Sequence, residues 1–240
     1  MHPKISVNGP QLRVADVGTG TRIWLTDLGK SLPATTQLDG LDISLDAAPP
    51  LEYLPSNVTL RKWDVKEPLP KDLTEAYDIV HIRNFTFVLL DSEVAQVVTK
   101  LIQLLEPGGL LQWGEAYVAS FRIEKMSLRA KMDALGELME LPQLQDARLS
   151  PKWAPQLASL FLAAGLEVES DIKDAPPHTA WSTHQCNLMI HEMMASQTGN
   201  QNLAKALMGV MPRAASETRD GAYYAFTRHT VIGRKSKKAT

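Results

Sequence analysis

Three aspartates in the first third of the chain each stand at or near the end of a short apolar run, where a carboxylate can hold a polar ligand. Asp16 precedes the glycine turn at residues 18–20, Asp42 ends the next run, and Asp64 ends the third. A carboxylate beside such a turn can accept a hydrogen bond from an ammonium group, and one about 20 residues further on typically binds a ribose diol. An acid after the third run can accept a hydrogen bond from an adenine amino group while Val65 packs against the ring. The spacing therefore predicts a site for a nucleoside-like ligand.

The glycine turn itself is a less specific signal. Gly18 and Gly20 allow a positive φ and a close approach of backbone to a ligand, but ordinary tight turns use the same residues. Asp42 could instead cap the following helix, and Asp64 could be an ordinary turn aspartate. Asp39 and Asp46 are neighbouring alternatives to Asp42, although strand alternation and position favour Asp42.

Alternating apolar and polar segments predict strands joined by helices, and hence a mainly parallel sheet with right-handed crossovers. Parallel strands end at one edge, so the three aspartates should meet there. We expect strands at residues 12–18, 36–44, 58–65, 77–85, 109–118, 167–173 and 222–235. We expect helices at residues 23–32, 92–105, 126–141 and 154–166, with further helices in the Met-rich stretch between residues 175 and 220.

Composition excludes several classes of function. The 240 residues carry a formal net charge of −2, so no basic surface suggests a nucleic-acid partner. Cys186 is the single cysteine, which excludes an internal disulfide and a cysteine-rich metal site, and we predict no metal. The sequence shows neither a membrane-spanning apolar run nor the apolar core of a signal peptide, and we expect a cytoplasmic protein without membrane contact.

Five segments together resemble the successive motifs of class I S-adenosylmethionine-dependent methyltransferases, and more narrowly the fungal secondary-metabolism and regulator-like branch of that family. They are VADVGTGTRIWLTDLG, QLDGLDIS, LPSNVTLRKWDV, YDIVHIR and LLEPGGLLQWGE. The resemblance implies an α/β fold with a Rossmann-like seven-stranded sheet, a reversed final strand, helices on both faces and a helical cap. It implies a single domain, with the core at about 11–120, 150–175 and 222–235 and the cap at about 121–150 and 176–221.

The resemblance also implies S-adenosyl-L-methionine as cofactor and assigns residues to its parts. The methionine moiety would lie near Asp16, Gly18 and Gly20, the ribose at Asp42 beside Ile43, and the adenine near Asp64 and Val65. Arg83 and Asn84, after the fourth strand, would face the cofactor or the substrate. The implied activity is methyl transfer to O, N or S of a small natural product. Two alternatives are a cyclisation or rearrangement on the same fold and a non-catalytic binding partner, and a homodimer or protein partner is also compatible. A dinucleotide dehydrogenase is disfavoured, because the full Gly-x-Gly-x-x-Gly spacing is absent.

Departures from the family pattern cluster near the expected site. Arg22 replaces the third glycine of the loop, Gly114 stands where relatives commonly carry an acid, and the chain begins about a dozen residues before the first strand. We predict that Arg22 turns inward, where it could pair with the cofactor's carboxylate. His81 and His184 are the predicted catalytic residues, although alternation also allows His81 a place in the core. His178 and His191 are further candidates for a general base.

Overall fold

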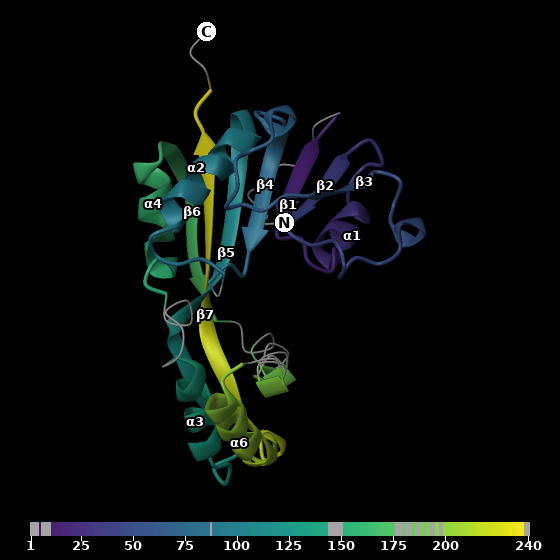
Figure 1. Ribbon diagram of the computed structural model, residues 1–240. Coiled ribbons are helices and arrows are strands. Elements are labelled where there is room, and N and C mark those ends of the chain that lie inside the picture. Colours follow the sequence, from purple (N-terminus) through teal and green to yellow (C-terminus); the bar gives the residue numbers. More distant parts are fainter. Residues whose placement is uncertain are drawn as a thin grey trace.

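A seven-stranded sheet forms the centre of the computed structural model, with strand order β3-β2-β1-β4-β5-β7-β6 (Figure 1). The structure describes residues 5, 11–86, 88–143, 151–175, 180, 184–185, 188–189, 191–192, 195–196 and 199–237. The strands are β1 (Arg13–Val17), β2 (Gln37–Asp42), β3 (Val58–Lys62), β4 (Tyr77–Arg83), β5 (Leu105–Lys125), β6 (Leu166–Asp174) and β7 (Ala222–Lys235). Strands β1 to β5 run parallel, and β7 is antiparallel to both β5 and β6. The predicted α/β sheet with a reversed final strand is confirmed.

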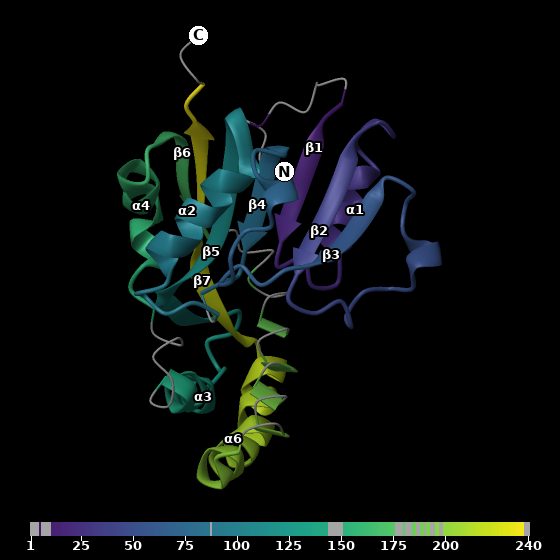
Figure 2. The same ribbon diagram turned by 45° about the horizontal axis from the view of Figure 1, so that its top comes forward.

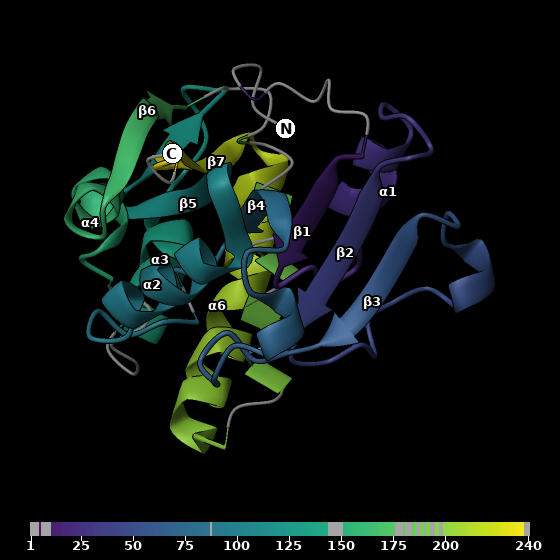
Figure 3. The same cartoon turned by 90° about the horizontal axis from the view of Figure 1, so that it is seen from above.

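Helices cover both faces of this sheet, as predicted (Figure 3). Helix α1 (Ile23–Gly29) buries Leu25 and Leu28 in a cluster with β1 and β2 residues. On the other face, α2 (Val94–Leu104) and α4 (Leu157–Ala163) pack against the core of β4 and β5. Short 3₁₀ turns occupy Leu51–Tyr53, Lys71–Leu73 and Ala154–Gln156.

A second group of helices projects beyond the carboxyl end of β5 (Figures 1 and 2). Strands β5 and β7 continue past the sheet as a two-stranded ribbon, in which Lys125 pairs with Ala222. Helices α3 (Asp133–Gln143) and α6 (Gln201–Arg219) pack against each other and this ribbon around their own buried cluster, and we call this unit the α3–α6 lobe. The Glu217 carboxylate accepts hydrogen bonds from the backbone N–H groups of Ala134 (3.0 Å) and Leu135 (2.9 Å). Glu217 thus satisfies donors in the first turn of α3 that the helix leaves unpaired.

Most element boundaries shift by a few residues from the sequence prediction, and β5 begins at Leu105 rather than residue 109. The helix expected from residue 126 begins only at Asp133, the helix expected to reach residue 32 ends at Gly29, and β5 runs to Lys125 rather than residue 118. The long β5 depends on pairing with β7, which lies about a hundred residues later in the chain and is invisible to a local pattern. Of the Met-rich stretch, α6 is described, whereas much of residues 176–198, including Cys186, lies outside the described residues.

Candidate active site

A cavity of about 610 Å³ opens at the carboxyl ends of β1 to β4. Its size is in the usual range for small-molecule sites, about 300–1,000 Å³. It lies where the strand order reverses on either side of β1, the place at which parallel α/β sheets bind ligands. All eight predicted cofactor-binding residues line it: Asp16, Gly18, Gly20, Asp42, Ile43, Asp64, Val65 and Arg83. The structure therefore brings these residues together, and the roles assigned to them remain predictions.

The glycine loop is shaped for close contact with a ligand. Gly18 and Gly20 have φ values of 68° and 52°, which side chains rarely adopt. A Cβ added to Gly18 would lie 2.4 Å from a ring carbon of Phe85, so any other residue there would have to displace this ring. The Gly18 N–H donates to the Leu41 carbonyl (2.8 Å), which ties the loop to the end of β2.

Asp42 holds the same loop from the neighbouring strand. Its Oδ2 accepts a hydrogen bond from the Gly20 N–H (2.8 Å), and its Oδ1 accepts one from the Ser44 N–H (3.2 Å). A carboxylate oxygen has two lone pairs, so each oxygen can accept one more hydrogen bond. The carboxylate is fixed in position and still able to bind a vicinal diol.

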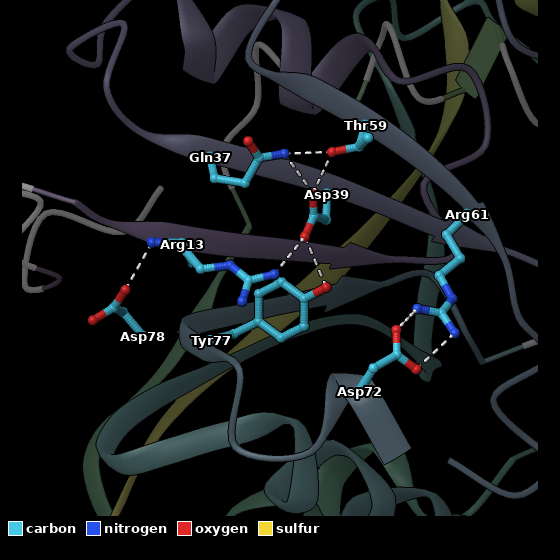
Figure 4. A network of polar contacts seen from close by, with 8 residues as sticks. All are labelled: Arg13, Gln37, Asp39, Thr59, Arg61, Asp72, Tyr77 and Asp78. Carbon is cyan, nitrogen blue, oxygen red and sulfur yellow. Dashed lines mark hydrogen bonds and ion pairs between the residues drawn. The ribbon is translucent and has the colours of Figure 1, made fainter. Parts of the chain in front are cut away.

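Asp39, the alternative to Asp42, is engaged elsewhere (Figure 4). Its carboxylate accepts hydrogen bonds from Arg13 (3.2 Å), Gln37 (2.7 Å), Thr59 (2.6 Å) and Tyr77 (2.9 Å). Burial raises the pKa of Asp39, but these hydrogen bonds outweigh burial and hold the pKa below its ordinary value. Asp39 ties four strands together and does not line the cavity described above.

Asp16 is held by His81 inside the sheet. Both side chains are buried, and Nδ1 of His81 lies 2.7 Å from Oδ1 of Asp16. Trp24 stacks on the imidazole with ring centroids 3.7 Å apart and planes 6° from parallel. Burial lowers the pKa of His81, although Asp16 acts in the opposite direction. A neutral His81 that donates Nδ1–H would fix the orientation of the Asp16 carboxylate. Asp16 lines the cavity, whereas His81 does not.

Asp64 sits in a tight turn at the adenine side of the expected site. Its Oδ1 accepts from the Lys66 N–H (2.8 Å), and its carbonyl accepts from the Glu67 N–H (2.9 Å). Asp64 also lines the cavity, so its role in the turn is compatible with the predicted role in binding adenine. Lys66, which also lines the cavity, is paired with Glu93 at 3.0 Å.

Glu115 is a buried residue of the site region that the sequence reasoning missed. Its carboxylate accepts hydrogen bonds from the backbone N–H groups of Phe85 (2.8 Å) and Thr86 (3.0 Å), from the Thr86 hydroxyl, and from the Trp113 indole (2.5 Å). Burial raises the pKa of Glu115 to about 7 against the effect of these bonds. The signal was its place two residues after Trp113, on the core-facing side of a strand. The acid expected at position 114 thus has a counterpart one residue later, where it shapes the loop after β4.

The remaining candidate histidines lie away from the cavity or outside the described residues. His184 is buried in the α3–α6 lobe, where Nε2 lies 2.9 Å from Thr218 Oγ1 and Nδ1 accepts from the Tyr224 N–H (3.1 Å). Burial lowers the pKa of His184 to about 4, with a smaller contribution from His191. His178 lies outside the described residues. A catalytic role for His81 or His184 stays a prediction.

Arg22 is buried but is not among the residues that line the cavity, so its orientation toward a cofactor stays a prediction. It adopts a left-handed conformation with φ of 62°, where its Nη1 donates to the Gly20 carbonyl.

Among the described residues, no group of three His, Cys, Asp or Glu could hold a metal ion. No described helix has the length and apolarity that crossing a membrane requires.

This combination of a glycine loop after β1, an acid after β2 and a reversed β7 defines the class I S-adenosylmethionine-dependent methyltransferase fold. A family model described as a methyltransferase domain matches residues 3–171, and the chain belongs to this family.

Individual relatives agree with that membership. The chain is 28% identical to methyltransferase grgD of Penicillium sp over 244 residues, covering 93% of this chain and 83% of that protein. It is 33% identical to N-methyltransferase tcpN of Claviceps purpurea over 140 residues, covering 52% of this chain and 49% of that protein. The solved [4+2]-cyclase SpnF has a TM-score of 0.57 at 16% identity, covering 97% of this chain and 77% of that one, and this likeness shows the fold alone.

Proposed function

We propose that this protein transfers the methyl group of S-adenosylmethionine to a nitrogen atom of a small natural product. The observation that carries the proposal is the convergence of the glycine loop, Asp16, Asp42 and Asp64 on one cavity. The choice of nitrogen, among the O, N and S acceptors that the sequence allows, is supported by the similarity to the N-methyltransferase of Claviceps purpurea. The net charge of −2 supports a small molecule over a nucleic acid as the substrate.

The residues present fit the cofactor. Asp42 would bind the ribose hydroxyls, Asp64 and Val65 the adenine, and the Gly18–Gly20 backbone with Asp16 the methionine moiety. A side chain at Gly18 would displace the ring of Phe85, which lines the same cavity. When bound, S-adenosylmethionine supplies a methyl group already activated by its sulfonium.

The chain contributes position rather than a strong base. Holding an acceptor in line with an activated methyl group can account for much of the acceleration. A neutral amine carries its own lone pair, so a general base is less necessary than for a hydroxyl acceptor. Transfer to an amine without a general base agrees with the lining of the cavity, which includes neither His81 nor His184.

We assign acceptor binding to the side of the α3–α6 lobe, which acts as the helical cap. The lobe lies at the carboxyl-end side of the parallel strands (Figure 2). A second cavity of about 680 Å³ lies between α3 and β5, with Tyr117, Phe121 and Met139 in its lining. Aromatic and methionine side chains suit a flat or irregular apolar substrate.

We also propose that the chain forms a single domain and that the protein is cytoplasmic. A single cysteine is consistent with a reducing compartment.

The test is turnover with S-adenosylmethionine and a panel of small amines, amides, phenols and thiols. We expect equimolar S-adenosylhomocysteine and a product heavier by one methylene group, with amines or amides as the acceptors. Conversion of a compound without S-adenosylhomocysteine would instead indicate cyclisation or rearrangement. Phe121→Ala should raise KM for the acceptor and leave S-adenosylhomocysteine binding unchanged, and the reverse result would remove the lobe from acceptor binding.

A further inference from the structure

Asn84 adopts an unusual backbone conformation in the turn that follows β4. Its φ of 61° lies in the left-handed region, which residues other than glycine rarely adopt, although asparagine tolerates it better than most. The side chain is exposed and lines the cavity of about 610 Å³. A left-handed backbone would suit glycine equally well, so the amide side chain at this point of the cavity calls for a reason of its own.

Strand β5 holds the turn on both sides of the Asn84 side chain. The Asn84 N–H donates to the Gly114 carbonyl (3.1 Å), and the next N–H, that of Phe85, donates to the buried Glu115 carboxylate (2.8 Å). Two successive N–H groups are therefore fixed to β5, and the side chain between them leaves a defined backbone. The same strand lines the second cavity at Tyr117, so Asn84 is tied to the strand that serves the acceptor side.

Asn84 also lies beside the part of the cavity proposed for the methionine moiety. The Phe85 ring packs against Gly18, where an added Cβ would lie 2.4 Å from a ring carbon, and all three residues line the cavity. In S-adenosylmethionine the sulfonium lies between the ribose and the amino-acid end. With the ribose at Asp42 and the amino-acid end at the glycine loop, the methyl group would be presented next to this turn.

The Asn84 amide differs in chemistry from the charged groups at this end of the cavity. The Asp16 carboxylate is engaged by His81, and Arg83 can only donate hydrogen bonds. The Asn84 side chain carries a neutral carbonyl oxygen, and it forms no hydrogen bond within the part of the chain that the structure describes. This oxygen is therefore available to accept a hydrogen bond from a substrate N–H group.

We propose that the side-chain carbonyl of Asn84 accepts a hydrogen bond from the N–H of the acceptor nitrogen, which makes Asn84 a catalytic residue that directs the nitrogen lone pair at the methyl group. The inference rests on the proposed function and narrows its substrate class to primary and secondary amines.

The hydrogen bond to Asn84 strengthens as the reaction proceeds. The amine lone pair forms the new N–C bond while the C–S bond breaks and leaves its electron pair on the sulfur. The nitrogen becomes positively charged and keeps its N–H proton until water removes it from the product. A charged N–H donates more strongly than a neutral one, so the bond is stronger in the transition state than in the bound amine. An interaction of this kind raises kcat more than it lowers KM.

The experiment compares the parent protein with Asn84→Gly, Asn84→Asp and the control Glu75→Gly. Glycine suits the left-handed backbone and removes the side chain alone, whereas aspartate retains an accepting oxygen. Glu75 is also left-handed, with φ of 50°, but does not line the cavity. The measurements are kcat and KM for the small amine that the parent methylates fastest, the calorimetric affinity for S-adenosylhomocysteine, and thermal unfolding as a check of folding.

We expect kcat of Asn84→Gly to fall about 10- to 100-fold, with KM for the amine within about threefold of the parent. Its affinity for S-adenosylhomocysteine should stay within about twofold, because the hydrogen bond is made to the acceptor alone. Asn84→Asp should recover most of the lost kcat, and Glu75→Gly should match the parent in every measurement.

The contrary results separate the inference from the proposed function. If the parent methylates no nitrogen compound, both fail; if it methylates amides and no amine, the inference alone fails. An unchanged kcat in Asn84→Gly would overturn the inference. Parallel losses of kcat and S-adenosylhomocysteine binding would assign Asn84 to the cofactor and overturn it too, as would a folded Asn84→Asp that is as slow as Asn84→Gly.

Discussion

Replacement of Glu115 by glutamine should remove a specific part of the pH dependence of folding. The carboxyl group is buried between Phe85, Thr86 and Trp113, and its pKa rises from an ordinary 4.5 to about 7. Each step of one in pKa corresponds to about 1.4 kcal/mol, so the difference amounts to about 3 kcal/mol.

The folded protein binds the Glu115 proton more tightly than the unfolded chain does. Between pH 4.5 and about 7 the folded protein keeps the Glu115 proton that the unfolded chain has lost. The stability linked to Glu115 is therefore fully present below pH 4.5 and is lost as pH rises through about 7. The protonated group can donate to the Thr86 hydroxyl, which in turn can donate to the Ala116 carbonyl at 3.4 Å.

Urea unfolding of the parent, Glu115→Gln and the exposed control Glu52→Gln, at several pH values between about 5 and about 8, measures this effect. In Glu115→Gln the amide donor lies near the Thr86 N–H and lowers stability at every pH. The comparison therefore uses the slope of the free energy of unfolding against pH, and not its absolute value. Over this range the parent and Glu52→Gln should lose up to about 3 kcal/mol more than Glu115→Gln. Identical slopes in all three proteins would refute the assignment of a raised pKa to Glu115.

Three further substitutions test single contacts. Gly18→Ala should cost about 2–4 kcal/mol of stability and abolish binding of S-adenosylhomocysteine, because the new Cβ meets Phe85 at 2.4 Å in a left-handed backbone; near-normal binding would contradict this. His81→Phe should weaken S-adenosylhomocysteine binding by about 1–2 kcal/mol by freeing Asp16, whereas a loss of kcat with unchanged binding would indicate a catalytic base. Glu217→Ala should speed hydrogen exchange of the first α3 amides while the sheet stays protected, and uniform acceleration would show that the lobe and sheet unfold together.

The sheet and the cofactor side of the site could be predicted because their signals are local. Each of β1 to β4 is a short apolar run, and the chemistry-bearing residues directly follow these runs, so parallel pairing alone brings Asp16, Asp42 and Asp64 to one edge. Asp39 could be set aside in favour of Asp42 on position, and its network with Arg13 and Tyr77 gives the physical reason.

What the sequence did not predict depends on contacts between distant segments. The extension of β5 to Lys125 requires β7, and the first turn of α3 is completed by Glu217, more than eighty residues later. The four hydrogen bonds of Glu115 come from the loop after β4, and no local pattern contains them. The burial of His184 in the α3–α6 lobe is likewise a consequence of tertiary packing.

We propose that the cavity at the ends of β1 to β4 binds S-adenosylmethionine through Asp42. Calorimetric titration of S-adenosylhomocysteine into the parent, Asp42→Ala and the exposed neighbour Asp46→Ala tests it most directly. We expect binding to the parent, an affinity weaker by about 1.5–3 kcal/mol in Asp42→Ala, and no change in Asp46→Ala. The absence of binding to the parent, or equal affinity in the parent and Asp42→Ala, would contradict the claim.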